Sequence, residues 1–287
     1  MRIYTRLILV YLLCGSSILS STAPPKKPQA KVLIQGIDHI PIIVSDPDSV
    51  AVIYKKLGFA IKPGRSHQNS IRNQHIKFPD GTELELITAS QPTDELSTEY
   101  YNWLKTGEGP LYFGLYSNDI SALAKQLDGF RQYETEGNSI TFPTTDVLHP
   151  LFFGSRNLSP SDKPAHFAHA NTATSLIGLW IATDSIATYL TLFKRLNIPL
   201  VYRKMNTPVG NVDVQVATLA QGEIILLPKS FKKIPGHQVI GATVSVADIT
   251  AVQQQLDQTG IKAERKAKSI YIEPAITHGI WLEFRQK

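Results

Sequence analysis

A pattern of an apolar strand that ends in an aspartate and leads into a short helix occurs four times in this chain of 287 residues. The four aspartates are Asp46, Asp119, Asp184 and Asp248. At the end of a strand, an aspartate side chain can accept the free N–H groups of the helix that follows. Each helix is followed by a stretch that ends in a further apolar strand. A repeat of roughly 45–60 residues with this order predicts four βαβββ modules.

The repeat also predicts where the elements lie. The first strands are expected over 37–45, 110–119, 176–184 and 239–248, the helices over 48–57, 120–127, 185–196 and 249–259, and the last strands over 80–88, 150–153, 223–227 and 279–284. Four such modules make a two-domain α+β protein. The first pair is expected over 36–155 and the second over 172–287, joined by a polar linker over 156–171 that contains two prolines.

The first 23 residues have the composition of a targeting segment. Arg2 and Arg6 precede a short apolar run, and small residues follow up to Ala23. This order predicts a secretory signal peptide. The apolar run is much shorter than the roughly 20 residues of a membrane-spanning helix. We therefore expect an exported protein, periplasmic or secreted, with no stable membrane span after signal removal and a flexible tether over 24–35.

Cysteine usage and charge limit the chemistry. Cys14 is the only cysteine, and it lies in the expected signal peptide. The mature chain is therefore predicted to have no disulfide, no thiolate nucleophile and no cysteine-ligated metal. The formal charge of +5 is modest, and part of it belongs to the signal peptide and the tether. Because no stripe of Lys or Arg alternates with aromatics, we predict no nucleic-acid partner.

The first module carries the most informative polar residues. His39 lies near the start of its first strand, and Glu83 and Glu85 lie in its last strand. Alternation along a strand turns His39 away from the apolar face, and it does the same for both glutamates. An imidazole and a carboxylate on one face suit a divalent-metal site or an acid–base pair. The alternative is a half-buried histidine near a solvated glutamate.

Several short motifs support a resemblance to a known family. They are Ile37-Asp-His39, Leu57-Gly-Phe59, Gly64-Arg-Ser-His67 followed by Asn73, Leu84-Glu-Leu-Ile87, Pro150-Leu-Phe-Phe153 and His169-Ala-Asn171. With the repeated modules, the chain resembles the vicinal oxygen chelate superfamily, in particular its glyoxalase-like branch, over about 36–284. The resemblance implies paired modules that curl around a divalent metal. In the last motif, Ala170 replaces the proline of the family's His-Pro-Asn turn.

The resemblance implies that His39 and Glu85 are metal ligands, with zinc, manganese, nickel or iron as the ion. The matching positions in the other modules are Tyr112, Ile177 and Gly241 on the first strands, and Phe152, Ile225 and Glu283 on the last strands. A site with two histidines and one carboxylate needs another imidazole. His67, His75 and His149 are the candidates. We expect Glu283 to be a structural carboxylate, since Gly241 takes the place of a histidine.

The functional prediction follows from these residues. We expect a metal-dependent lyase, isomerase, hydrolase or dioxygenase that acts on a small oxygen-rich molecule. His67 is predicted to move a proton or orient the substrate, and Arg72 and Asn73 to bind the substrate. The alternative is a metal-free protein of the same fold that binds or sequesters a small molecule. The working pocket is expected in the first pair of modules, and the second pair is expected to be a scaffold or a homodimerisation surface.

Overall fold

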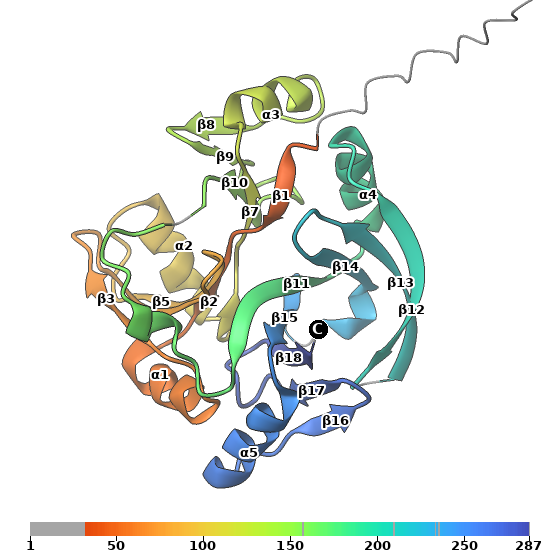
Figure 1. Ribbon diagram of the computed structural model, residues 1–287. Helices are drawn as coiled ribbons and strands as arrows, with labels where there is room; N and C mark the ends of the chain where they lie inside the picture. The colour runs from red at the N-terminus through yellow and green to blue at the C-terminus, as the bar shows by residue number, and fades with distance from the viewer. Residues whose placement is uncertain (1–31, 157, 209, 233, 235, 287) are drawn as a thin grey trace, which may run out of the picture. The chain divides into compact units, whose positions relative to one another are not determined.

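A computed structural model describes residues 32–286 apart from 157, 209, 233 and 235 (Figure 1). The expected signal peptide and most of the expected tether, 24–35, lie outside the described residues. The first strand begins at Ile34, so the last two residues of the range expected to be tether belong to a strand. Among the helices of the described residues, none is long and apolar enough to cross a bilayer.

The first half of the described chain contains two five-stranded sheets. Its elements are β1 (Ile34–Ile37), β2 (His39–Ile43), α1 (Pro47–Lys56), β3 (Lys62–Ser66), β4 (Ile71–Lys77), β5 (Glu83–Ala89), α2 (Glu95–Leu104), β6 (Gly109–Pro110), β7 (Phe113–Ser117), α3 (Ile120–Leu127), β8 (Glu134–Glu136), β9 (Ser139–Thr141) and β10 (Leu151–Gly154). One sheet has the order β3-β4-β5-β2-β6 and the other β1-β7-β10-β9-β8. The backbone passes directly from β1 to β2, so residues 34–43 supply one strand to each of the two sheets.

The second half forms a single eight-stranded sheet. Its elements are η1 (Pro164–Phe167), β11 (Ala173–Thr183), α4 (Ile186–Arg195), β12 (Leu200–Thr207), β13 (Gly210–Thr218), β14 (Glu223–Pro228), η2 (Lys229–Phe231), β15 (Val239–Val246), α5 (Ile249–Thr259), β16 (Glu264–Lys266), β17 (Ser269–Ile272) and β18 (Trp281–Gln286). The strand order is β12-β13-β14-β11-β15-β18-β17-β16. The two modules therefore join through the central β11–β15 pair.

The α+β prediction of repeated βαβββ modules is confirmed by this topology. Three of the four aspartates cap their helices as expected: Asp46 accepts from Asp48 N, Asp119 from Ala122 N and Asp248 from Thr250 N. The fourth helix, α4, starts differently. Its N-cap residue is Ser185, and no side chain caps its first turn. The strand–aspartate pattern thus located the modules correctly, although it predicted one cap that does not form.

Helix α2 was not predicted from the sequence. Asp94 and Ser97 form a reciprocal capping box at its start. The helix lies on the face of β2 and β5 opposite to α1 (Figure 1), and it buries Tyr100 against Ile43 and Ile87. We call the face of the β3-β4-β5-β2-β6 sheet that is turned away from α1 the inner face. Because α2 packs over one end of it, the inner face of the first half is apolar at that end and polar further along.

The segment between the two halves is bound to the first half by hydrogen bonds. His169 accepts from Ala60 N through Nδ1 at 2.9 Å and donates from Nε2 to Lys77 O at 3.0 Å. Asn171 donates to Leu57 O at 2.8 Å. Both side chains are buried. Most of the apolar core forms one cluster that contains residues of both halves.

Candidate metal centre

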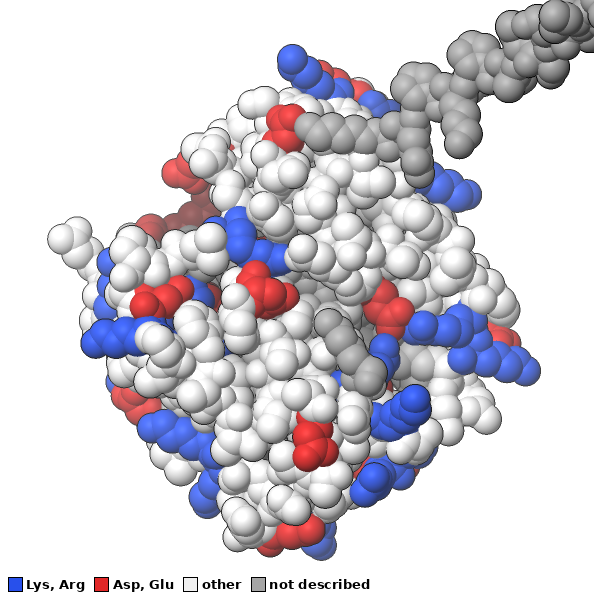
Figure 2. All heavy atoms as spheres, viewed as in Figure 1, with Lys and Arg blue, Asp and Glu red and all other residues white. Residues whose placement is uncertain are grey.

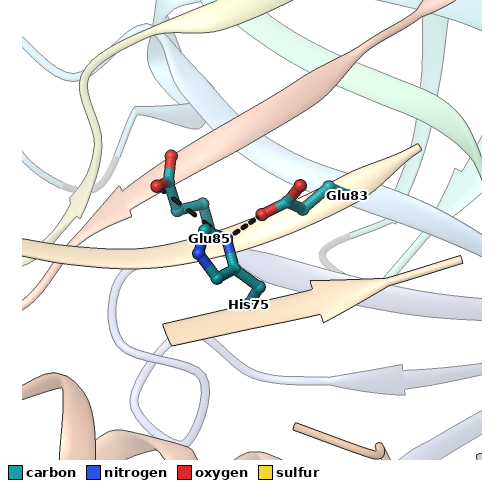
Figure 3. A group of neighbouring side chains, drawn as sticks. All are labelled: His75, Glu83 and Glu85. Carbon is teal, nitrogen blue, oxygen red and sulfur yellow. Dashed lines mark hydrogen bonds and ion pairs between the residues drawn. The ribbon is translucent and has the colours of Figure 1, made fainter. Parts of the chain in front are cut away.

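Polar side chains from three adjacent strands gather on the inner face of the first half. They are His39 of β2, Asn73 and His75 of β4, and Glu83 and Glu85 of β5. The parallel β2–β5 pair and the antiparallel β4–β5 pair place these residues in neighbouring rows. One donor atom from each of His75, Glu83 and Glu85 lies within 4.8 Å of the others, and Figure 3 shows the imidazole turned toward both carboxylates.

The Glu85 carboxylate lies between two imidazoles. Its Oε2 is 3.9 Å from His39 Nε2, and its Oε1 is 4.0 Å from His75 Nδ1. Two ligands that share one ion at about 2 Å each are separated by at most about 4 Å. The observed spacings are therefore compatible with an ion between an imidazole and the carboxylate.

Two side chains hold these donors in place. Asn73 donates from Nδ2 to Glu85 Oε1 at 2.7 Å, and its own Oδ1 accepts from Arg65 N at 3.0 Å. Asp38 accepts from His39 Nδ1 at 2.6 Å, which leaves Nε2 facing Glu85. A carboxylate behind a ligating histidine fixes the ring and its tautomer. Asn73, predicted to bind substrate, thus contacts Glu85 and the β3 backbone.

The surroundings shift the protonation of His39 and Glu85. Burial alone would lower the pKa of His39, but the hydrogen bond to Asp38 and the charges of Asp38, Glu85 and Glu83 outweigh it and raise that pKa to about 9. For Glu85, burial raises the pKa of the carboxyl, and the charge of Glu83 adds to this effect, whereas the charge of His39 opposes it. The His39 imidazolium is therefore stabilised between the carboxylates of Asp38 and Glu85.

The four donor side chains of the cluster are largely buried, and three of them keep some exposure to solvent. The Glu83 side chain is 1% exposed, while His39, His75 and Glu85 are 18%, 17% and 13% exposed. Lys77 Nζ lies 3.6 Å from Glu83 Oε2 and 3.2 Å from Asp162 Oδ2. Its ammonium already offsets part of the negative charge of Glu83.

An aromatic residue of the second module covers His39. The ring of Phe152 on β10 lies 5.0 Å from the imidazole of His39. Phe152 pairs with Gly114 on β7, where a Cβ would lie 2.6 Å from the phenyl ring. The glycine therefore leaves the space that the ring occupies. The second module contributes an aromatic wall to the site.

His149, a candidate third ligand, has both ring nitrogens engaged elsewhere. Its Nε2 contacts Glu99 at 3.0 Å and the Tyr112 hydroxyl at 3.1 Å, and Nδ1 contacts Phe142 O at 2.9 Å. The hydrogen bond to Glu99 is the main reason that the pKa of His149 is raised. Of the three candidate histidines, His75 is the one that the fold brings to Glu85.

The remaining predicted site residues lie elsewhere. Arg72 pairs with Asp46 and Asp48 on the α1 side of the sheet, since adjacent strand residues face opposite ways. His67 lies in the β3–β4 turn, where its N–H donates to Ile71 O. His75 lies four positions after Ile71 on β4, which corresponds to about 13 Å along the strand. His67 and Arg72 instead line a cavity of about 570 Å³ at the end of the sheet.

The second half has a structurally equivalent position for each member of the cluster. The β15–β18 register pairs Gly241 with Trp281 and Thr243 with Glu283, as β2–β5 pairs His39 with Glu83. Tyr271 faces Glu283 as His75 faces Glu85. The second half therefore keeps one carboxylate and replaces the imidazoles and the other carboxylate.

Glu283 is buried and fully engaged. It accepts hydrogen bonds from Thr243 at 2.7 Å, Ser269 at 2.6 Å, Tyr271 at 3.1 Å and both Arg285 donors. The arrangement is that of a structural carboxylate paired with Arg285.

Paired βαβββ modules with a histidine–carboxylate cluster on an inner face define a protein of the vicinal oxygen chelate type. The family model described as a glyoxalase-like domain matches residues 37–196, which is more than half of the chain. The chain belongs to this glyoxalase-like family, and the resemblance predicted from the sequence is confirmed.

Solved structures agree on the fold. A hypothetical protein from Staphylococcus aureus aligns with a TM-score of 0.60 at 11% identity, covering 88% of this chain and all of that one. A variant of 4-hydroxymandelate synthase from Streptomyces coelicolor gives 0.61 at 11% identity, covering 88% and 93%. Catechol 2,3-dioxygenase gives 0.58 at 9% identity, covering 89% and 93%. No curated protein sequence matches the chain. At these identities the structural likeness shows the fold alone.

Proposed function

We propose that the protein is a divalent-metal-dependent enzyme that acts on a small oxygen-rich molecule at the inner face of its first half. The observation that carries the proposal is the convergence of His75, Glu83 and Glu85 within 4.8 Å, with His39 on the other oxygen of Glu85. Imidazole and carboxylate donors together suit zinc, manganese, nickel or iron. A bound cation would act as a Lewis acid on substrate oxygens.

The chain's own groups have separate tasks in this proposal. His39, His75, Glu83 and Glu85 would hold the ion, and Asp38 and Asn73 would position two of them. Phe152 excludes water from one side of His39. A metal must replace the proton that the raised pKa of His39 keeps on its ring, so binding would release that proton. The reaction class, whether lyase, isomerase, hydrolase or dioxygenase, depends on the substrate.

His67 remains our prediction for a group that moves a proton or orients the substrate, with Arg72 as a substrate-binding residue. Support comes from their shared position on the wall of the 570 Å³ cavity. If the substrate extends into this cavity, His67→Ala and Arg72→Ala raise KM or lower kcat without changing the metal content.

The test is the metal content of the full chain, measured by elemental analysis after incubation with zinc, manganese, nickel or iron(II) and removal of excess ion. We expect about one equivalent of one of these ions. The repeat supplies a matched pair of variants: Glu85→Gln is expected to lose the metal, whereas Glu283→Gln is expected to keep it. Metal well below one equivalent with every ion would exclude the proposal.

A metal-free binding protein is the second candidate. In the second module, Phe152 and Tyr112 take the positions that match Glu85 and His39 of the first module, and neither is a usual metal ligand. The Lys77 ammonium beside Glu83 also favours this candidate, because it already offsets part of the negative charge. A small molecule that binds metal-free protein, with affinity unchanged by His39→Ala and Glu85→Ala, would support it.

We also propose that the protein is exported after removal of residues 1–23. The order of basic, apolar and small residues supports this location. The mass of the mature protein from a secreting host tests it. Cleavage near Ser21 or Ala23 is expected, and an uncut chain would argue against export.

On the face shown in Figure 2, Lys and Arg are interspersed with Asp and Glu, in keeping with a small-molecule rather than a nucleic-acid partner.

A further inference from the structure

A second cavity, of about 220 Å³, lies on the face of the second half's sheet that carries Glu283 and corresponds to the inner face of the first half. Its floor comes from four neighbouring strands, β14, β11, β15 and β18. Other lining residues come from the end of β12, at Thr207 and Pro208, and from η2, at Ser230 and Phe231. The lining residues are Trp180, Leu227, Ile240, Trp281, Thr207, Pro208, Ser230 and Phe231. Three of these eight are large aromatics.

The cavity has a specific origin in the repeat. Gly241 takes the position that His39 has in the first half, and Trp281 takes that of Glu83. A Cβ on Gly241 would lie 2.6 Å from the Trp180 indole. The lack of a side chain at Gly241 is thus what lets the Trp180 indole lie over β15. The positions that form a polar cluster in one half form an aromatic floor in the other.

Hydrogen bonds of the lining residues are made within the protein. Trp180 donates from Nε1 to Thr243 Oγ1 at 3.0 Å, and Thr207 donates to Gly210 O at 2.7 Å. The Thr243 hydroxyl in turn donates to Glu283. The described lining side chains include no charged group. What the cavity offers a ligand is therefore chiefly ring faces and aliphatic surface.

These features select a class of ligand. Aromatic rings stack on one another in offset or edge-to-face geometry, and each such pair adds about 0.5–1.5 kcal/mol beyond burial. Pockets for drug-sized ligands span roughly 300–1,000 Å³, so a cavity of this volume suits a smaller molecule. We propose that the second half holds a binding site for a neutral, flat, apolar molecule of one or two fused rings, between Trp180, Trp281 and Phe231.

This site is independent of the metal proposal. It lies in the other half of the chain and uses none of the residues of the polar cluster. It also gives the second half a task other than the scaffold or dimerisation role expected from the sequence.

The experiment uses 5-fluoroindole as the probe and follows its ¹⁹F NMR signal during titration with the full chain. Trp281→Ala removes a partly exposed part of the floor, and Ile240→Phe fills the cavity from a buried position. Tyr202→Ala is the matched control, because Tyr202 is an aromatic of the same half that is 66% exposed. Glu85→Gln tests whether the probe binds at the polar cluster of the first half instead. Circular dichroism and thermal unfolding establish that each variant is folded.

We expect saturable binding that is weakened at least about tenfold by Trp281→Ala or Ile240→Phe and unchanged by Tyr202→Ala and Glu85→Gln. Should one cavity variant fail to fold, the other decides. The proposal is overturned by no saturable binding, by equal affinity in a folded cavity variant, or by equal affinity for glucose. Loss of binding in Glu85→Gln would also overturn it, because the probe would then be in the first half.

Discussion

His39 Nδ1 donates a hydrogen bond to the buried Asp38 carboxylate at 2.6 Å, and the opposite ring nitrogen faces Glu85. The two residues are neighbours in sequence at the point where β1 passes into β2. This step of the backbone places the carboxylate behind the imidazole.

Asp38→Asn removes the charge behind His39 and keeps the size of the side chain. The pKa of His39 is then expected to fall below its value of about 9, and metal affinity to fall by about 10–100-fold. An NMR titration of the imidazole measures the first effect, and competition with a chelator measures the second. Asp184→Asn, at an exposed aspartate that caps no helix, is the control. Unchanged affinity in Asp38→Asn would show that Asp38 does not position the ligand.

His237 predicts an acid sensitivity of the folded state. It is buried, stacks on Trp103 at 3.7 Å between ring centroids, and burial lowers its pKa to about 4. The unfolded chain binds this proton near pH 6.5, so the contribution is complete above that pH and is lost as pH falls toward 4. At 1.36 kcal/mol per pKa unit, the free energy of unfolding should drop by roughly 2–3 kcal/mol from this group.

His237→Gln tests this directly, since glutamine does not titrate. The difference in unfolding free energy between wild type and variant, measured by urea unfolding at several pH values, should shrink as pH falls from 6.5 to 4. A difference that stays constant over that range would contradict the assignment to His237. His166→Gln, at a histidine that is not buried, should leave the pH dependence unchanged.

Glu283→Ala is expected to destabilise the second half. It leaves the Arg285 guanidinium with Glu223 as its remaining ion-pair partner, and it deprives three hydroxyls of their acceptor. Removing one member of a buried pair costs about 3–5 kcal/mol. Chemical denaturation measures the loss. Glu264→Ala, at a 46% exposed carboxylate, should cost at most about 1 kcal/mol. Equal effects of the two variants would exclude the pairing described here.

Gly241→Ala should disturb the aromatic floor. The added Cβ would meet the Trp180 indole at 2.6 Å, and overpacking of this kind costs about 1–3 kcal/mol. Near-UV circular dichroism should show a changed tryptophan signal. Gly154→Ala is the comparison, because a Cβ there meets no atom within 4 Å. An unaltered spectrum in Gly241→Ala would show that the indole does not lie over β15.

Arg72→Ala should change stability by about 1 kcal/mol or less, because its pairs with Asp46 and Asp48 are largely exposed. Metal affinity should not change, since Arg72 lies on the other face of the sheet from Glu85. Isothermal titration calorimetry with the ion identified by elemental analysis measures this affinity. A tenfold loss of affinity would mean that the faces are assigned wrongly.

The sequence predicted the modules because each begins with the same local pattern, and in three of the four the aspartate caps its helix. A strand ends, an aspartate follows, and a helix needs its N–H groups satisfied. Alternation likewise predicted that His39, Glu83 and Glu85 face the same way. The missed helix α2 had a local signal too, in the Asp94–Ser97 spacing of a capping box. It was overlooked because α2 lies between modules rather than within the repeat.

The candidate site was only partly predictable. His75 was one of three histidines, and only the β4–β5 register brings it beside Glu85. Alternation predicts the correct face for Glu83, but the resemblance gives a ligand role only to Glu85 on that strand. Arg72 and Asn73 were grouped although adjacent strand residues point to opposite faces. The contacts of Phe152 with His39 and of Asp162 with Lys77 join distant segments, and no local pattern encodes them.

The hydrogen bonds of His169 and Asn171 to the first half bear on whether either half could exist as a separate chain. Each half also supplies an acceptor to the other, since Leu176 N donates to Thr82 Oγ1 and the Tyr54 hydroxyl donates to Thr277 O. Phe59 stacks on Phe284 at 5.6 Å between ring centroids in the shared core. A gene shortened to one half would encode a chain with unsatisfied backbone groups and open apolar surface. Neither half is therefore expected to persist as a separate chain, although the two carry different residues at equivalent positions of their sheets.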